Sequence, residues 1–297
     1  MALWSAEFVV DKALARRLLR QFDELDARSL RPLSEGWDYA IWVVDEQWAF
    51  RFPRRASVVR GTLLEIAALP ELAPLLPLPI PAPVFVGEPT DDFPWPFFGS
   101  RLLPGRELAE LELDDEQRRQ VGLQLAAFLR ALHSAELAAE LPADSNRRAD
   151  MGERVPKTRD QLDELERLAI WERPPLVDAI LVEAEALPPA RTAAVVHGDL
   201  HFRQLLATDE GRLTGVLDWV DLCRSDPAID LTMLWAYLPP NARGEFLDAY
   251  GPLDDSELLR ARVVALSVWG ALAHYGHVEG HTPIEREAVA GLGRIVS

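Results

Sequence analysis

Three polar side chains near residue 200 have the types and spacing that phosphoryl transfer requires. Asp199 stands in a His-Gly-Asp triplet that begins at His197. The amide Gln204 comes five residues after Asp199, and Asp218 comes nineteen residues after it. A carboxylate can orient an acceptor hydroxyl and take its proton, and oxygen ligands suit Mg²⁺. The stretch therefore predicts a site in which Asp199 acts on the acceptor while Gln204 and Asp218 hold Mg²⁺.

The same stretch permits a second chemistry. His197 and His201 flank Asp199, and two imidazoles with one carboxylate can form the metal site of a hydrolase. Such hydrolases need further His or Asp clusters downstream, but the next histidine after His201 is His274. A hydrolase is therefore the weaker interpretation. A second group of histidines has helix-face spacing that can hold zinc, although a solvated face is the favoured interpretation: His274, His277 and His281.

Three blocks of this region resemble the aminoglycoside and macrolide phosphotransferase family, which shares the fold of the protein kinases. The catalytic loop of that family reads H-G-D-x-H-x-x-N, its metal strand I-D-W or I-D-F, and the next segment D-P-x-x-D-L. The corresponding blocks here follow in the same order and spacing: His197–Gln204, Leu217–Trp219 and Asp226–Leu231. Upstream, Trp48–Arg54 resembles the third strand of the family and Pro94–Gly105 its hinge.

The resemblance covers roughly residues 30–250. It implies an α+β protein with a two-lobed, protein-kinase-like fold, in which a small N-lobe contains an antiparallel sheet and a larger C-lobe is mainly helical. We expect the N-terminal helix and N-lobe at residues 1–98, a hinge at 99–105, and the C-lobe with the catalytic loop and acceptor pocket at 106–297.

The resemblance also implies roles for individual residues. Asp199 matches the catalytic aspartate and Asp218 the metal-binding aspartate. Gln204 stands where most members have asparagine, so a carbonyl oxygen is kept on a longer stem. Arg51 stands where many members have a phosphate-binding lysine, and a guanidinium can still bridge phosphate and a helix glutamate. Glu65 is the expected partner of Arg51.

Five further positions complete the predicted site. His197 and Asp230 are expected to support the catalytic loop, His197 by packing and Asp230 as the buttressing aspartate of the family. Gly36 is the single glycine of the loop expected over the phosphates, and Ser100 and Leu102 are hinge positions expected to bind the nucleotide.

Periodicity and turn residues predict the elements around these positions. Asp11 and Ser57 are candidate N-caps, and Asp114 with Gln117 forms a capping-box pattern. We expect short strands at 32–34, 39–44, 47–52 and within 193–218, and helices at 10–25, 57–69, 114–132, 159–168, 176–187, 227–237, 243–250 and 256–275. Residues 70–104 contain ten of the 23 prolines, which predicts a linker between lobes with extended segments.

Composition limits the class of protein and its partners. The net charge of −17 repels phosphate backbones and anionic lipid, so neither nucleic acid nor a membrane surface is an expected partner. The single cysteine, Cys223, excludes an internal disulfide and a Cys-based zinc cage within one chain. With no signal-peptide or membrane-span pattern, a cytoplasmic protein is expected. The oligomeric state is left open.

The resemblance thus predicts a small-molecule kinase that uses Mg²⁺ and transfers the γ-phosphate of ATP or GTP to a hydroxyl of an aminoglycoside-like or macrolide-like acceptor. The acidic charge would suit a cationic acceptor, and residues of about 135–190 are expected to shape its pocket. Two alternatives stay open. A metabolite kinase for an amino alcohol or sugar would carry the same motifs, and a nucleotide-binding protein without turnover would explain Gln204, Arg51 and the glycine-poor loop.

Overall fold

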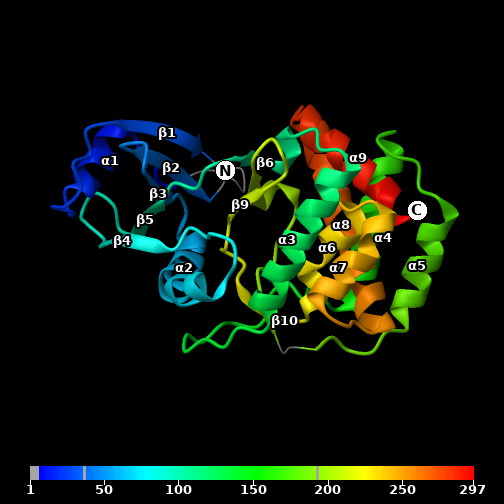
Figure 1. Ribbon diagram of the computed structural model, residues 1–297. Helices are drawn as coiled ribbons and strands as arrows, with labels where there is room; N and C mark the ends of the chain where they lie inside the picture. Colours follow the sequence, from blue (N-terminus) through cyan, green and yellow to red (C-terminus); the bar gives the residue numbers. More distant parts are fainter. Residues whose placement is uncertain (1–6, 36–37, 192–193) are drawn as a thin grey trace. The chain divides into compact units, whose positions relative to one another are not determined.

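The chain divides into two units, each with its own core. The computed structural model describes residues 7–35, 38–191 and 194–297 (Figure 1). Unit 1 comprises the residues up to Pro74, Pro79–Leu103 and Leu137–Ala139, and unit 2 comprises Leu75–Leu78, Pro104–Glu136 and Glu140–Ser297. The antiparallel sheet of unit 1 and the helices of unit 2 confirm the predicted α+β class. The boundaries at 98–99 and 105–106 stay predictions.

Unit 1 is built on a five-stranded antiparallel sheet in the order β1-β2-β3-β5-β4. Its strands are β1 (Leu30–Glu35), β2 (Tyr39–Val44), β3 (Trp48–Pro53), β4 (Pro83–Gly87) and β5 (Phe97–Arg101). The three strands predicted before residue 53 are confirmed. The linker predicted at residues 70–104 is wrong, because β4 and β5 lie within it and pair with each other in this sheet. Pro83 begins the edge strand β4, where a missing N–H is tolerated, and β5 contains no proline.

Alternation along β3 separates the core of unit 1 from its polar face. Phe50 and Phe52 are fully buried, and the ring of Phe52 stacks on Phe97 with centroids 4.8 Å apart. The helix α1 (Lys12–Leu19) covers this aromatic cluster with Leu18. Because successive side chains of a strand point to opposite faces, Arg51 is directed away from the cluster. It meets the second helix of the unit, α2 (Val59–Leu72).

Both helices of unit 1 differ from the predicted bounds. Asp11 caps α1 as predicted, since its Oδ1 accepts from the Leu14 N–H at 2.7 Å. The helix ends at Leu19 rather than residue 25, and Phe22 and Leu25 pack on the core from the turns that follow. Before α2, a 3₁₀ turn at Ala56–Val58 moves the start of the α-helix beyond Ser57, so the predicted cap is wrong.

Unit 2 is mainly helical. Its helices are α3 (Asp115–His133), α4 (Met151–Arg167), α5 (Pro175–Glu185), α6 (Thr232–Ala236), α7 (Arg243–Tyr250), α8 (Asp255–Val278) and α9 (Thr282–Ile295). Its short strands are β6 (Arg106–Glu107), β7 (Ala194–Val196), β8 (Leu205–Ala207), β9 (Leu213–Val216) and β10 (Cys223–Ser225). Strand β7 pairs with β10, and β8 pairs with both β6 and β9. None of the helices formed by the described residues is long and apolar enough to span a membrane.

Several elements of unit 2 are confirmed and others are corrected. The capping box of Asp114 and Gln117 starts α3, and α7 has the predicted bounds. Helix α4 begins eight residues before the predicted start, because an apolar stripe that includes Met151 and Val155 outweighs the proline inside the helix. The predicted helix at 227–237 is a 3₁₀ turn, Pro227–Asp230, followed by α6. Helix α9 was not predicted.

Candidate active site

The His-Gly-Asp triplet lies directly after β7 in unit 2. The strand pair β7 and β10 fixes the start of this loop, and a 3₁₀ turn at Phe202–Gln204 leads from it into β8. Strand β9, which pairs with β8, ends two residues before Asp218. Two neighbouring strand pairs therefore place Asp199, Gln204 and Asp218 in one region of unit 2, as the sequence predicts.

Asp230 holds the main chain of the loop. Its side chain is fully buried, and its two carboxylate oxygens accept from the N–H groups of His197 at 2.6 Å and Gly198 at 2.9 Å. His133, at the end of α3, lies with Nε2 3.2 Å from Asp230 Oδ2, and its Nδ1 lies 2.7 Å from the Tyr250 hydroxyl. Charge-assisted hydrogen bonds of this kind fix a backbone strongly, so Asp230 sets the conformation from which Asp199 projects.

His197 is committed to packing and to the loop. Its buried ring packs against Trp219 with centroids 4.7 Å apart, Nε2 lies 2.8 Å from the Leu217 carbonyl oxygen, and Nδ1 accepts from the Asp199 N–H at 3.3 Å. Both ring nitrogens are thus used within the protein. A hydrolase site that needs His197 and His201 as metal ligands is excluded by this arrangement.

Asp199 presents a partly exposed carboxylate, with 41% of its side chain accessible. Its Oδ2 lies 3.6 Å from Nε2 of His201. Burial alone would raise the pKa of this carboxyl, but the hydrogen bond and charge of His201, and after them the charge of Arg148, lower it below its usual value. Asp199 is therefore ionised at neutral pH and can accept a hydrogen bond from a hydroxyl group.

Gln204 and Asp218 lie side by side. The Nε2 of Gln204 is 3.4 Å from Asp218 Oδ2, and the Gln204 backbone oxygen accepts from the Leu217 N–H at 2.8 Å. Asp218 has φ of 62°, a left-handed conformation that costs a non-glycine residue about 1 kcal/mol. Such strain is concentrated at functional positions.

This pair fits a magnesium ion better than a transition metal. A carboxylate and an amide supply oxygen donors, which Mg²⁺ prefers, and protein sites for Mg²⁺ use one or two carboxylates together with phosphates and water. Among the residues that the structure describes, no group of three or more His, Cys, Asp and Glu side chains could hold a metal ion. A site built wholly from protein ligands is thus not found there, whereas a phosphate-linked Mg²⁺ needs no such group.

In unit 1, Arg51 forms the predicted ion pair with Glu65. Nη1 of Arg51 lies 3.2 Å from Oε1 of Glu65, and both side chains are buried. The Tyr39 hydroxyl donates to the other carboxylate oxygen at 2.8 Å and lies 3.0 Å from Thr62 Oγ1. Burial and the charge of Glu65 raise the pKa of Tyr39 well above its usual value, so its hydroxyl stays a donor.

The remaining predicted nucleotide positions are less distinctive. Ser100 is fully buried in β5, with its Oγ 3.5 Å from the Arg101 carbonyl oxygen. Leu102 is half-buried and its N–H donates to the Gln47 carbonyl at 2.8 Å. Gly36 lies outside the described residues. A nucleotide-binding role for these three positions stays a prediction.

Side chains in the two other groups considered from the sequence have protein partners. In the group at 274–281, His277 Nδ1 lies 2.9 Å from Glu285 Oε1, and the His281 ring stacks on Tyr275. Cys223 is buried in β10, and burial raises the pKa of its thiol to about 12. The favoured interpretation of Cys223 as a small buried side chain is confirmed.

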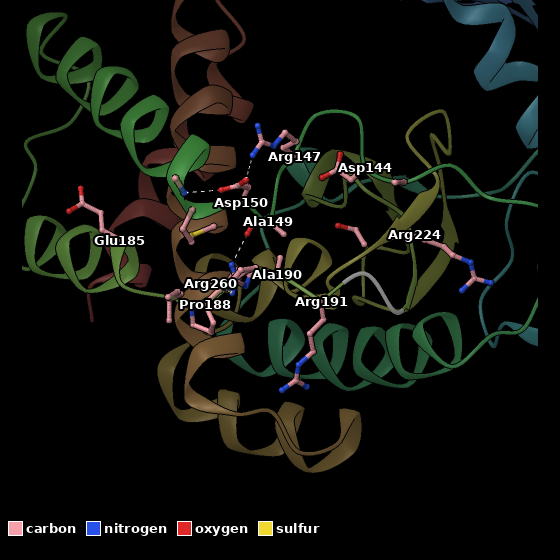
Figure 2. A pocket seen from close by; sticks show the side chains of 16 residues that line it. Asp144, Arg147, Ala149, Asp150, Glu185, Pro188, Ala190, Arg191, Arg224 and Arg260 are labelled. Atoms are coloured by element: carbon pink, nitrogen blue, oxygen red, sulfur yellow. Dashed lines mark hydrogen bonds and ion pairs between the residues drawn. The ribbon is translucent and has the colours of Figure 1, made fainter.

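A cavity of about 370 Å³ lies in unit 2 beside the segment expected to shape an acceptor pocket (Figure 2). Its polar lining is already bonded: Asp150 accepts from the Gly152 N–H, and Arg260 donates to the Ala149 carbonyl oxygen. Arg191 and Arg224 are directed away from its centre (Figure 2). Asp199, Gln204 and Asp218 are not among its described lining residues, so this cavity is not the reaction site.

Sequence reasoning missed three residues that contact the site. Tyr39 binds Glu65, His133 binds Asp230, and Arg148 places its charge near Asp199. The signal for Tyr39 was available, since it is the first residue of a predicted strand that pairs with β3. His133 and Arg148 reach partners 97 and 73 residues away, which no local pattern indicates.

Comparison with known proteins supplies a family and a fold. A family model described as the phosphotransferase enzyme family matches residues 29–262. No curated protein matches the sequence. Solved structures match with low identity, and at this identity they show a shared fold.

Three of these structures illustrate the range. The GDP and kanamycin complex of APH(2")-IIia is 22% identical, with a TM-score of 0.67 over 96% of this chain and 98% of that chain. The GDP complex of wild-type aminoglycoside 2'-phosphotransferase-IIIa is 21% identical, with a TM-score of 0.65 over 96% and 97%. The apoenzyme of macrolide 2'-phosphotransferase MphH from Brachybacterium faecium is 22% identical, with a TM-score of 0.62 over 94% and 97%.

Proposed function

The chain belongs to the phosphotransferase enzyme family, and from that membership we propose that it is a small-molecule kinase. It would transfer the γ-phosphate of ATP or GTP to a hydroxyl of an antibiotic-like acceptor, an aminoglycoside or a macrolide. Structural neighbours bound to GDP, to kanamycin and to ADP support a nucleotide donor and this class of acceptor. The observation that carries the proposal is an ionised, accessible Asp199 on a loop held by Asp230, beside the paired Gln204 and Asp218.

Each side chain has a task that follows from its geometry. Asp199 accepts a hydrogen bond from the acceptor hydroxyl and orients its oxygen toward the γ-phosphorus. As that oxygen bonds to phosphorus, the bond from phosphorus to the β,γ-bridging oxygen breaks, and the hydroxyl proton passes to Asp199. The low pKa of Asp199 suits an orienting group that takes the proton late, as a loose transition state requires.

Positive charge on the phosphates comes from two sources. In unit 1, Arg51 binds phosphate oxygens with the guanidinium nitrogens that do not contact Glu65. In unit 2, Asp218 and the carbonyl oxygen of Gln204 would hold Mg²⁺, which when bound neutralises charge on the phosphate oxygens. Asp230 keeps the loop in place during the transfer without touching the reacting atoms.

A metabolite kinase for a sugar or amino alcohol is the second candidate. Asp221, three residues beyond Asp218, is bonded to Arg148 rather than left to bind an acceptor amine. The site is therefore less suited to a polycation than the net charge of −17 suggests. A sugar or a singly charged amino alcohol would need fewer carboxylate partners than an aminoglycoside.

A panel of acceptors tests the proposal. Wild-type protein is incubated with Mg²⁺, with ATP or GTP, and with aminoglycosides, macrolides, amino alcohols or sugars, and phosphorylated acceptor is measured by mass spectrometry. We expect one class to give product, and Asp199→Asn to lower that rate by about 10² to 10⁴ with nucleotide affinity nearly unchanged. The matched control is Asp209→Asn, an exposed aspartate between β8 and β9, which should keep the wild-type rate.

The possible outcomes separate the candidates. Product with aminoglycosides or macrolides supports the first, and product only with amino alcohols or sugars supports the second. Wild-type rates no higher than those of Asp199→Asn across the panel would contradict both and favour a nucleotide-binding protein without turnover. In that case Gln204→Asn, which restores the family residue, would show whether the longer amide prevents catalysis.

A further inference from the structure

Arg148 occupies a position that the proposed chemistry does not yet explain. It lies in the loop before α4, and only 14% of its side chain is accessible. Nη1 lies 2.8 Å from Asp144 Oδ1, and the Arg148 N–H donates to Asp144 Oδ2 at 2.6 Å. Nη2 lies 2.5 Å from Asp221 Oδ1. The guanidinium therefore bridges two carboxylates that are 77 residues apart in the chain.

The Asp221 end of this bridge touches the catalytic loop. Gly198 has φ of +91°, and a Cβ at this position would lie 2.4 Å from the Asp221 carbonyl oxygen and 3.1 Å from its Cβ. Glycine is needed here both for the backbone angle and for the close approach of Asp221. A change in the position of Asp221 would thus be transmitted to Gly198, the residue before Asp199.

The loop is consequently held from two sides. Asp230 binds the N–H groups of His197 and Gly198, and Asp221 packs against Gly198. The first contact fixes the hydrogen-bonded side of the loop. The second depends on Arg148, because the guanidinium ties the Asp221 side chain to the loop before α4.

Charge provides an independent observation. Burial raises the pKa of the Asp199 carboxyl, whereas His201 and then Arg148 lower it. Arg148 therefore lies near enough to Asp199 for its charge to favour the ionised carboxylate. The exposed neighbour Arg147 pairs with Asp150 and Glu153 instead, and its side chain is 61% accessible.

We propose that Arg148 is a positioning residue of the catalytic loop: by bridging Asp144 and Asp221 it keeps Asp221 against Gly198 and so fixes the direction in which Asp199 projects. The inference rests on the proposed function, because it assigns Arg148 to the step that Asp199 performs. Arg148 itself touches neither the acceptor nor the nucleotide. Its loss should lower kcat and leave nucleotide binding unchanged.

The kinetic experiment compares Arg148→Gln, Arg148→Lys and the matched control Arg147→Gln with wild type. For Arg148→Gln we expect kcat to fall by about 10- to 100-fold, because misplacement of a reacting group by about 1 Å has an effect of this size. The KM for nucleotide should stay within about twofold. Arg148→Lys, which keeps the charge, should recover part of kcat, and Arg147→Gln should match wild type.

A second variant guards against simple unfolding. Arg148→Gln leaves the buried Asp144 carboxylate without its counter-charge, which can destabilise the protein. The double variant Asp144→Asn, Arg148→Gln removes both charges, so it should recover thermal stability but not kcat. Recovery of kcat together with stability would overturn the proposal and leave Arg148 a stabilising residue.

A measurement without turnover separates this inference from the proposed function. Amide hydrogen exchange at Gly198, whose N–H is bonded to Asp230, should be faster in Arg148→Gln than in wild type or Arg147→Gln. If wild type shows no transfer to any acceptor, the proposed function fails while this measurement still tests the positioning role. Unchanged exchange at Gly198, or an unchanged kcat in an active enzyme, would overturn the role of Arg148.

Discussion

The two units hold their buried charges in different ways. In unit 1, Arg51 and Glu65 are opposite charges joined side chain to side chain, with Tyr39 as a third partner. In unit 2, the Asp230 carboxylate is bound by backbone N–H groups of the catalytic loop and by His133. The first arrangement fixes where a side chain lies, and the second fixes where the main chain lies. Damage to the first should weaken nucleotide binding, and damage to the second should misplace Asp199.

The largest effect is expected for Asp230→Ala. This change leaves the His197 and Gly198 N–H groups buried without an acceptor, and hydrogen bonds to a charged group contribute about 1.5–3 kcal/mol each. The free energy of unfolding should fall by about 4 kcal/mol, measured by urea denaturation. Asp209→Ala is the exposed control and should stay within about 0.5 kcal/mol of wild type. A loss below about 1 kcal/mol for Asp230→Ala would show that the loop does not depend on this carboxylate.

Glu65→Gln should have the next largest effect, in unit 1. It leaves the buried Arg51 charge unpaired, and breaking a buried pair in this way typically costs 3–5 kcal/mol. We expect a loss of about 3 kcal/mol together with weaker nucleotide binding by calorimetry. The double variant Arg51→Met, Glu65→Leu should be nearly as stable as wild type but should still bind nucleotide weakly. If nucleotide affinity is unchanged in both variants, phosphate binding does not involve Arg51.

Tyr39→Phe tests the third partner and should have a smaller effect. It removes one hydrogen bond to Glu65 and one contact with Thr62, while the ion pair with Arg51 is kept. Loss of such a bond lowers stability by about 1 kcal/mol, which a shift of the urea midpoint would report. Nucleotide affinity should change less than in Glu65→Gln. An equal loss of affinity in the two variants would mean that the hydroxyl, rather than the charge pair, positions Arg51.

The smallest change is expected in the acid pH dependence. The folded-state pKa of Asp199 lies below its usual value, so its ionised form favours the folded state above the usual pKa, and this contribution disappears as the pH falls through the lower, folded-state pKa. Because the side chain is 41% accessible, the contribution to stability is small. We expect the titration of the Asp199 carboxyl, followed by NMR, to have its midpoint below about pH 3.9. A midpoint above that value would contradict the influence of His201 and Arg148.

Local patterns were sufficient where the site depends on one strand or one turn. The alternation in β3 places Arg51 opposite the phenylalanine cluster, and the capping pattern at Asp114 marks the start of α3. The order and spacing of the motif blocks led to Asp199, Asp218 and Asp230 and to the kinase-like fold. These features depend on residues close together in sequence.

Predictions failed where distant contacts decide the outcome. The proline-rich stretch forms two strands because β5 pairs with β3, a contact across about 50 residues that overrides its composition. Arg148 looks like one charge among many, and its partner Asp221 lies 73 residues away. Ser57 has the right type for a helix cap, but the preceding 3₁₀ turn moves the helix start past it. In each case the deciding interaction has no local signature.

The buried cysteine of β10 has a practical consequence for spectroscopy. Cys223 is the only cysteine of the chain, and with its pKa raised to about 12 it remains a protonated thiol that reacts slowly with maleimides and methanethiosulfonates. The natural sequence therefore serves as an unreactive background for site-directed labelling. A cysteine introduced at exposed Val84 in unit 1 or Val182 in unit 2 would be the one fast-reacting thiol. With both introduced, fluorescence or spin-label distances could follow the two units in solution without first replacing a native residue.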